Sequence, residues 1–260
     1  MFQLIPALSF KRRTFFYALT LTLVAAMSNA ASAAVLSLDS ITRVNSVTQA
    51  NLTDGNTDWA YWAPNTGTGQ TPPVAPTNRK LGGSIISSMS NVGGSTLRGS
   101  TTASTTVHYN YTDGTNPTSA TDASLAGLIF NSALGSNASG NGLSLTLTGD
   151  PTMPSVAKLY LGGFAATGNL TLTLNGATTV VNSSQIFPNT GPKQMAIYTV
   201  TYQPDNASDL LTVQFTASAI TDVTNGHVGA QAVAVATPEP GILSLAAAGI
   251  LFFARRRGHR

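Results

Sequence analysis

Apolar and polar residues alternate along most of the middle of this chain. Successive side chains of a β-strand point to opposite faces of a sheet, so a period of two is typical of strands with one buried face. Each alternating stretch is bounded by Gly, Pro, Asn or Asp, which favour turns. The pattern predicts strands over residues 108–111, 143–149, 158–164, 169–176, 197–204 and 210–218.

Between its two ends the sequence has no apolar stripe at helical spacing, so the body is expected to be all-β. Strands about 8–12 residues apart are typical of a sandwich or barrel, and one domain accommodates residues 35–236. Asn141-Gly142 and Asn175-Gly176 are expected to form hairpin turns. Alternating leucines are expected to form much of the core, namely Leu143, Leu145, Leu147, Leu159, Leu161, Leu170, Leu172 and Leu174.

The N-terminal 34 residues have the organisation of a secretory signal peptide. Basic residues 11–13 precede a 14-residue apolar run, which is expected to be helical, and small residues follow it. Cleavage is predicted after Ala30, Ala33 or Ala34, and a retained membrane anchor is the alternative.

Charge is concentrated at the two ends of the chain. Of 13 Lys and Arg, three lie at positions 11–13 and four within 255–260, so the body has six against nine Asp, a net charge of −3. This excludes the clustered basic face of a nucleic-acid-binding protein. The chain has no Cys, which excludes disulfides and thiolate metal sites, and its charged fraction of 9% suits an extracellular surface.

The C-terminal 24 residues combine three elements. Pro238-Glu239-Pro240 precedes an apolar run at 241–254, followed by a basic cluster at 255–260. As a transmembrane helix the 14-residue run spans about 21 Å, and the flanking residues extend it towards the roughly 30 Å hydrocarbon core. Arg255, Arg256 and Arg257 favour a cytoplasmic C-terminus, which leaves the body outside the inner membrane.

This tail, from Thr237 to the arginines, closely resembles the PEP-CTERM sorting tail of bacterial secreted proteins. The resemblance implies processing at Pro238-Glu239-Pro240 by an exosortase, a membrane-embedded cysteine transpeptidase. It also implies an inner-membrane intermediate, then the cell surface or an exopolysaccharide matrix such as a biofilm. A plain single-span anchor is the alternative.

The body resembles a β-sandwich module of bacterial secreted proteins, similar in layout to galactose-binding-like jelly rolls. The resemblance is carried by DGNTDWAYW (54–62), NRKLGGSI (78–85), NYTDGTNPTSAT (110–121) and KLYLGGFAATGNLTLTL (158–174). It implies an antiparallel, jelly-roll-like β-sandwich and no particular activity.

Asp54, Asn56 and Asp58 have the D-x-N-x-D spacing that offers alternate oxygens to Ca²⁺, although the glycine and glutamate of an EF-hand loop are missing. The alternative is an Asp-Gly turn that leads into a strand. Trp59, Tyr61 and Trp62 form the aromatic cluster of the body. An exposed ring there would stack on a sugar. At strand period Trp62 faces away from the other two, and packing of the tryptophans in the core is the alternative.

Catalytic patterns are scarce. The sequence has no nucleophile elbow and no metal-spaced His pair, and most aspartates lie in predicted turns. The Arg79-Lys80 pair is expected in a solvated loop after an exposed, low-complexity stretch at 65–78. The sequence thus favours an exported, non-enzymatic surface or matrix protein without cofactors. A carbohydrate-binding module using Trp59 or Trp62 is the alternative, followed by a polysaccharide hydrolase.

Overall fold

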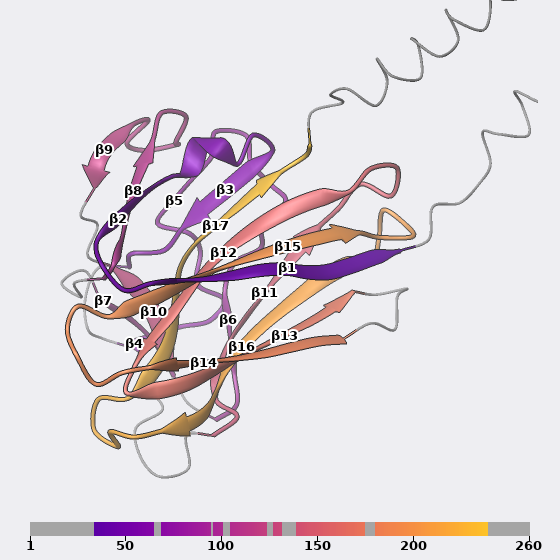
Figure 1. Ribbon diagram of the computed structural model, residues 1–260. Helices are drawn as coiled ribbons and strands as arrows, with labels where there is room; N and C mark the ends of the chain where they lie inside the picture. The colour runs from indigo at the N-terminus through magenta and orange to yellow at the C-terminus, as the bar shows by residue number, and fades with distance from the viewer. Residues whose placement is uncertain are drawn as a thin grey trace, which may run out of the picture. The chain divides into compact units, whose positions relative to one another are not determined.

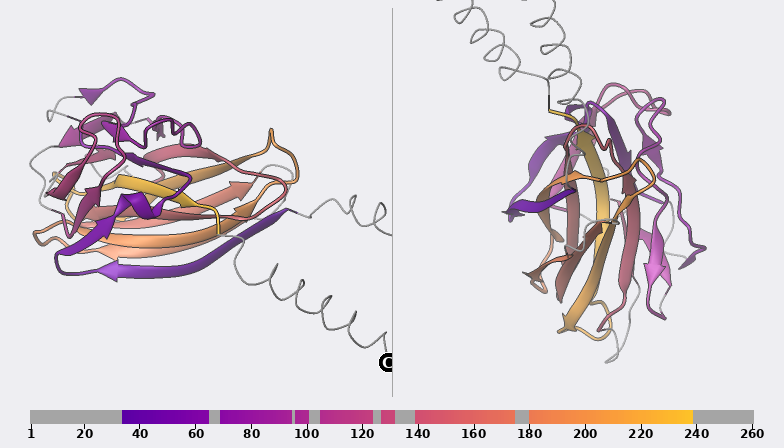
Figure 2. Two further views of the ribbon diagram at one scale, coloured as in Figure 1. Left: turned by 90° about the horizontal axis from the view of Figure 1, so that it is seen from above. Right: turned by 90° about the vertical axis from the view of Figure 1, so that its right-hand side faces the viewer.

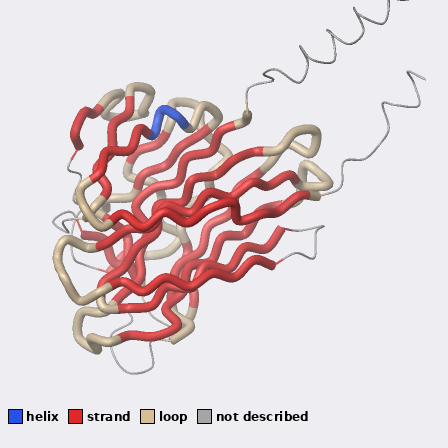
Figure 3. The backbone as a smooth tube through the Cα atoms, in the orientation of Figure 1, coloured by secondary structure: helices blue, strands red, loops and turns tan. Residues whose placement is uncertain are grey.

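The computed structural model describes residues 34–238 apart from 65–68, 95, 101–104, 124–126, 132–138 and 175–179 (Figure 1). These residues form an all-β fold of mainly antiparallel sheets, consistent with a β-sandwich. The one helical turn among them is the 3-10 helix η2 (Leu52–Asp54), visible in Figure 3. All six predicted strands are present, and their bounds lie within three residues of the expected ones.

The largest sheet has nine strands, in the order β1-β15-β12-β17-β10-β7-β4. Strand β3 pairs with the C-terminal half of β17, next to the segment that pairs with β10, and β5 pairs with β3. The bounds are β1 (Val35–Val44), β3 (Asp58–Tyr61), β4 (Gly69–Gln70), β5 (Asn78–Arg79), β7 (Leu97–Ser100), β10 (Leu128–Asn131), β12 (Ser155–Phe164), β15 (Gln194–Gln203) and β17 (His227–Ala236).

A five-stranded sheet, in the order β14-β13-β16-β11-β6, packs against the nine-stranded sheet. Its strands are β6 (Ser90–Val92), β11 (Gly142–Thr148), β13 (Ala166–Leu174), β14 (Val180–Phe187) and β16 (Leu210–Ile220). The two layers are visible in Figure 2. The core between them contains all eight predicted leucines, each at most 2% exposed, because the alternation turns them to one face.

A small sheet of β2 (Thr48–Asn51), β8 (Val107–Tyr111) and β9 (Ala120–Ala123) lies near β3 and η2 (Figure 1). Strands β2 and β8 are parallel. A second hydrophobic cluster joins residues of β8 to residues of β3, β12 and β17. Strand β17 therefore contributes to two clusters, which explains why its first nine residues are all buried.

Two local predictions were wrong. Asn141-Gly142 is not a hairpin turn: Gly142 begins β11, the positive φ is at Gly140, and Asn141 Oδ1 accepts a hydrogen bond from the amide of Gly94. The stretch 65–78 is not simply an exposed loop, because Val74 and Asn78 are buried where the structure describes it. Val74 exchanges two backbone hydrogen bonds with Met89.

Some predictions fall on residues outside the described ones. These are the signal peptide up to residue 33, Asn175-Gly176, Glu239, Pro240, the apolar run 241–254 and the arginines 255–257. Within the described part of the chain, no helix has the length and apolar character that crossing a membrane requires.

Candidate functional site

The candidate calcium ligands and the candidate aromatic residues lie on one short segment, residues 54–62, which contains β3. Asn51 caps η2 by accepting a hydrogen bond from the Thr53 amide at 3.2 Å, and the Gly55 amide closes the turn on the Leu52 carbonyl. A Cβ at Gly55 would lie 2.7 Å from the Asp58 carbonyl oxygen, so the turn requires glycine there. The interpretation of an Asp-Gly turn that leads into a strand therefore describes this segment.

The three side chains of the D-x-N-x-D pattern have different partners. Asp54 Oδ1 accepts from Asn51 at 2.8 Å, Asn56 pairs with the backbone of Thr237, and Asp58 faces Arg79. No group of three or more His, Asp or Glu side chains that could hold a metal ion occurs among the described residues. The three side chains therefore serve three separate structural roles: Asp54 stabilises a turn, Asn56 joins the segment to Thr237, and Asp58 forms an ion pair.

Asp58 is a fully buried carboxylate at the start of β3. Its Oδ2 accepts from the amides of Ile85 and Ile86, at 2.8 and 3.2 Å, and from Arg79 Nη2 at 3.2 Å. Its Oδ1 lies against Gly83, where a Cβ would approach to 1.9 Å. Asp58 therefore ties the loop of residues 83–86 to the sheet by charge-assisted bonds.

The aromatic residues of β3 and the tryptophan that follows it are core residues, which corrects the prediction of a glycan platform. Trp59 and Trp62 are 0% exposed and Tyr61 is 1% exposed, so none of the three presents a ring face to a sugar. The predicted split is confirmed: Trp59 and Tyr61 lie in the cluster beside β8, and Trp62 lies in the core between the two large sheets. Removing the large apolar surface of these rings from water is favourable, so the rings pack in the two clusters and are not exposed for a ligand.

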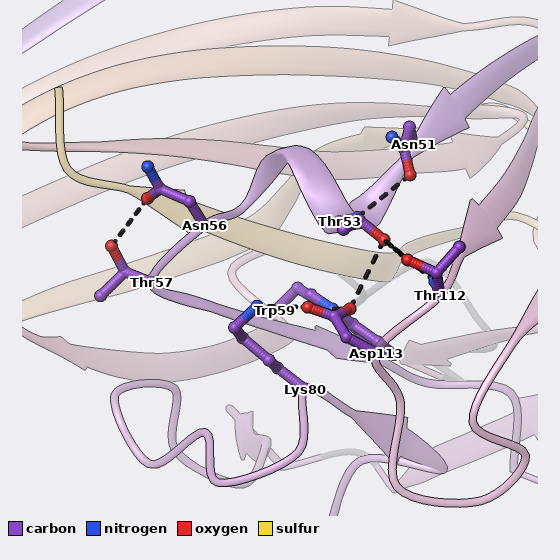
Figure 4. Close-up of polar contacts among 8 residues, drawn as sticks. All are labelled: Asn51, Thr53, Asn56, Thr57, Trp59, Lys80, Thr112 and Asp113. Carbon is purple, nitrogen blue, oxygen red and sulfur yellow. Dashed lines mark hydrogen bonds and ion pairs between the residues drawn. The ribbon is translucent and has the colours of Figure 1, made fainter. Parts of the chain in front are cut away.

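A polar cluster surrounds the indole nitrogen of Trp59 (Figure 4). Trp59 Nε1 donates to Asp113 Oδ1 at 2.7 Å, and Lys80 forms an ion pair with Asp113 Oδ2. Thr53 accepts from the amide of Thr112 at 3.0 Å. Desolvation raises the pKa of Asp113, but hydrogen bonds from Lys80 and Trp59 outweigh it and hold the pKa below its ordinary value.

Arg79 and Lys80 are not in a solvated loop as expected. Arg79 belongs to β5, and each of the two cations pairs with an aspartate distant in sequence. Neighbouring Asn78, which the sequence did not single out, is 3% exposed and joins β5 to residues 111–117. Its Oδ1 accepts from the amides of Thr115 and Asn116. These partners have no local sequence signal.

Asn56 and Thr57 also hold the last residue before the Pro-Glu-Pro motif. Asn56 Nδ2 donates to the Thr237 carbonyl at 3.2 Å, and the Thr237 amide donates to Asn56 Oδ1 at 3.0 Å. Thr57 Oγ1 accepts from the same amide at 3.0 Å, and its single hydrogen is shared between Asn56 Oδ1 at 3.0 Å (Figure 4) and Thr237 Oγ1 at 3.3 Å. Pro238, the first residue of the motif, is exposed immediately beyond this contact.

His227, at the start of β17, is a buried titratable residue that the sequence did not assign to a site. It is 6% exposed, and its ring lies 4.5 Å from that of Phe130 and 6.0 Å from that of Phe164. Its Nδ1 lies 2.6 Å from the Asn225 carbonyl oxygen. Burial lowers the pKa of His227 to about 4, and the nearby charge of Lys193 acts in the same direction.

No protein-family model matches this chain, and a search of curated proteins finds no significant similarity to it. The function of the chain is therefore inferred from its sequence and from the contacts described above. The candidate site is a set of structural ion pairs, together with a junction where the body meets the C-terminal tail.

Proposed function

We propose that this chain is an exported, non-enzymatic protein of the cell surface or of an exopolysaccharide matrix, sorted through its C-terminal tail. The observation that carries the proposal is the order of elements at the end of the chain. Strand β17 ends at Ala236, Thr237 is held by the body, and Pro238-Glu239-Pro240, the apolar run and the arginines follow directly. Its partners are an exosortase-type enzyme, the inner membrane transiently, and extracellular polysaccharide.

The aspartates of the body support a non-enzymatic role. A glycosidase needs two carboxyl groups, one of which has a raised pKa. Each described aspartate whose pKa departs from its ordinary value has a lowered pKa: Asp113, Asp150 and Asp222. Asp150 and Asp222 accept hydrogen bonds from their own turns, and Asp58 is buried in an ion pair. These carboxylates have structural partners.

The burial of Trp59 and Trp62 disfavours a carbohydrate-binding module that uses them. Contact with polysaccharide would instead involve the Ser-, Thr- and Asn-rich surface. For the body we propose the jelly-roll-like, galactose-binding-like layout, and the crossing of consecutive strands between the two large sheets supports a jelly-roll-like connection. Strands β15 and β17 belong to the nine-stranded sheet, whereas β16 belongs to the five-stranded one.

The test replaces Pro238, Glu239 and Pro240 by alanine in the full chain. Mass spectrometry of the C-terminus, from cell-surface and culture fractions, then reports whether the tail is removed. We expect a full-length, membrane-retained protein with a normally folded body, because the enzyme no longer has an extended proline-flanked segment to bind. Replacing Arg255, Arg256 and Arg257 by alanine is expected to weaken retention of the unprocessed chain instead.

Normal trimming and release of the triple-alanine variant would show that the tail is a plain anchor. Turnover of a polysaccharide by the purified chain would contradict the non-enzymatic role.

A further inference from the structure

The contact between Asn56, Thr57 and Thr237 extends the pairing of β3 with β17 by one residue. The last backbone pair of that ladder is Asp58 with Val235, and the Thr57 amide donates to the Val235 carbonyl at 3.1 Å. Beyond it, the side-chain amide of Asn56 bonds both the amide and the carbonyl of Thr237, as a neighbouring strand would. Thr237 is thus held at two backbone groups and at its hydroxyl.

The next residue cannot continue this ladder. Pro238 has no amide hydrogen to donate, so regular pairing ends at Thr237. The processing motif therefore begins at the first residue after the held one.

An enzyme that cleaves a chain binds residues on both sides of the bond. On the N-terminal side of Pro238 those residues are Thr237, which is held, and Ala236, the last residue of β17. Asn56 is exposed and Thr57 is half-buried, so these bonds can exchange with water more easily than the buried ladder can. Opening this contact would free Thr237 without unfolding β17.

We propose that Asn56 and Thr57 form a latch that keeps Thr237 on the body and so restrains cleavage at the Pro-Glu-Pro motif. This inference rests on the proposed function. The latch limits how often the processing enzyme can bind the residues that precede the motif, and so limits the cleavage rate. It acts through Thr237, so Asn56 and Thr57 are positioning residues.

The test uses the full chain in producing cells. Asn56→Ala removes the side-chain amide, and Thr57→Val removes the hydroxyl at nearly constant shape. Asn206→Ala is the matched control, since Asn206 is an exposed asparagine that bonds Asp209 within its own turn. Pulse-chase labelling with mass spectrometry of the C-terminus gives the trimming rate. Amide hydrogen exchange of the membrane-retained form reports protection at Thr237.

We expect the Thr237 amide to be protected in the parent and to lose protection in Asn56→Ala with Thr57→Val. Trimming of that double variant should be about fivefold faster than in the parent. In the Asn56→Ala background, Thr57→Ser keeps a hydroxyl that Thr57→Val removes. The trimming rate of this second double variant should therefore be close to that of Asn56→Ala alone. Asn206→Ala should leave protection and rate unchanged. Exchange at β12 and β15 in the same sample checks that the body of each variant is folded.

An unprotected Thr237 amide in the parent would overturn the latch. So would an unchanged or slower trimming rate in a folded double variant that has lost protection. The triple-alanine variant at residues 238–240 separates this failure from that of the proposed function. If that variant is not trimmed but the double variant is trimmed at the parent rate, sorting stands and the latch fails. If the triple-alanine variant is trimmed normally, the sorting proposal fails.

Discussion

Trp59 Nε1 donates a 2.7 Å hydrogen bond to Asp113 Oδ1, which joins residues 54 positions apart in the sequence. The indole ring is fully buried, and its centroid lies 4.7 Å from that of Tyr111. The other oxygen of Asp113 pairs with Lys80. One carboxylate thus satisfies a buried indole and a partly buried ammonium, and it ties together β3, the residue after β5 and the turn after β8.

Replacing Trp59 by Phe should destabilise the fold by about 2 kcal/mol, because a hydrogen bond to a charged acceptor is lost. Urea denaturation measures the change. In an Asp113→Asn background the same substitution should cost less, since the acceptor is neutral. Equal costs in both backgrounds would mean that the effect comes from ring volume alone.

Asp58→Ala should cost about 3–5 kcal/mol, because it leaves Arg79 and the amides of Ile85 and Ile86 without their acceptor. Asp58→Asn should cost less, since an amide oxygen still accepts from the amides of Ile85 and Ile86. Denaturant midpoints measure both. Asp39→Ala, at an exposed position of β1, is the surface control and should change stability far less. A similar loss in the two alanine variants would refute this account of the buried pair.

Gly83→Ala should destabilise the chain by about 1–3 kcal/mol, because the new Cβ would lie 1.9 Å from Asp58 Oδ1. Gly94→Ala is the matched control, since no atom lies within 4 Å of a Cβ there. Thermal melting of the two variants gives the comparison. A Gly83→Ala variant as stable as Gly94→Ala would contradict the close contact.

His227 should make the stability depend on pH. Its pKa is about 4 in the fold and about 6.5 in an unfolded chain, so the unfolded state binds the proton first. Its contribution is complete above about pH 6.5 and is lost as the pH falls towards 4. Between pH 7 and 4.5 the parent should lose about 2–3 kcal/mol more than His227→Gln, measured by urea denaturation.

Calcium at millimolar concentration should leave the melting temperature unchanged. Asp54, Asn56 and Asp58 are engaged with Asn51, Thr237 and Arg79, so binding would have to break existing contacts. A melting shift that disappears in Asp54→Ala would restore the calcium-site interpretation.

The strands could be predicted because alternation is a local property. A residue on a half-buried strand faces either the core or water, and the residues two positions away face the same side. Leu143, Leu145 and Leu147 therefore identify their own buried face, as Leu170, Leu172 and Leu174 do. The opposite faces of Trp59 and Trp62 follow from the same rule, without any knowledge of the layers on each side.

The sequence by itself thus determined the all-β class, most long strands and their core faces. The tertiary structure decided that β3 is covered on both faces, which buries the aromatic residues, and that Arg79 and Lys80 have aspartate partners. It also decided that Asn56 holds Thr237, a residue 181 positions away. Pairings over such separations depend on which strands become neighbours in the sheets. No periodicity along the chain encodes that arrangement, so only the packed fold brings the partners together.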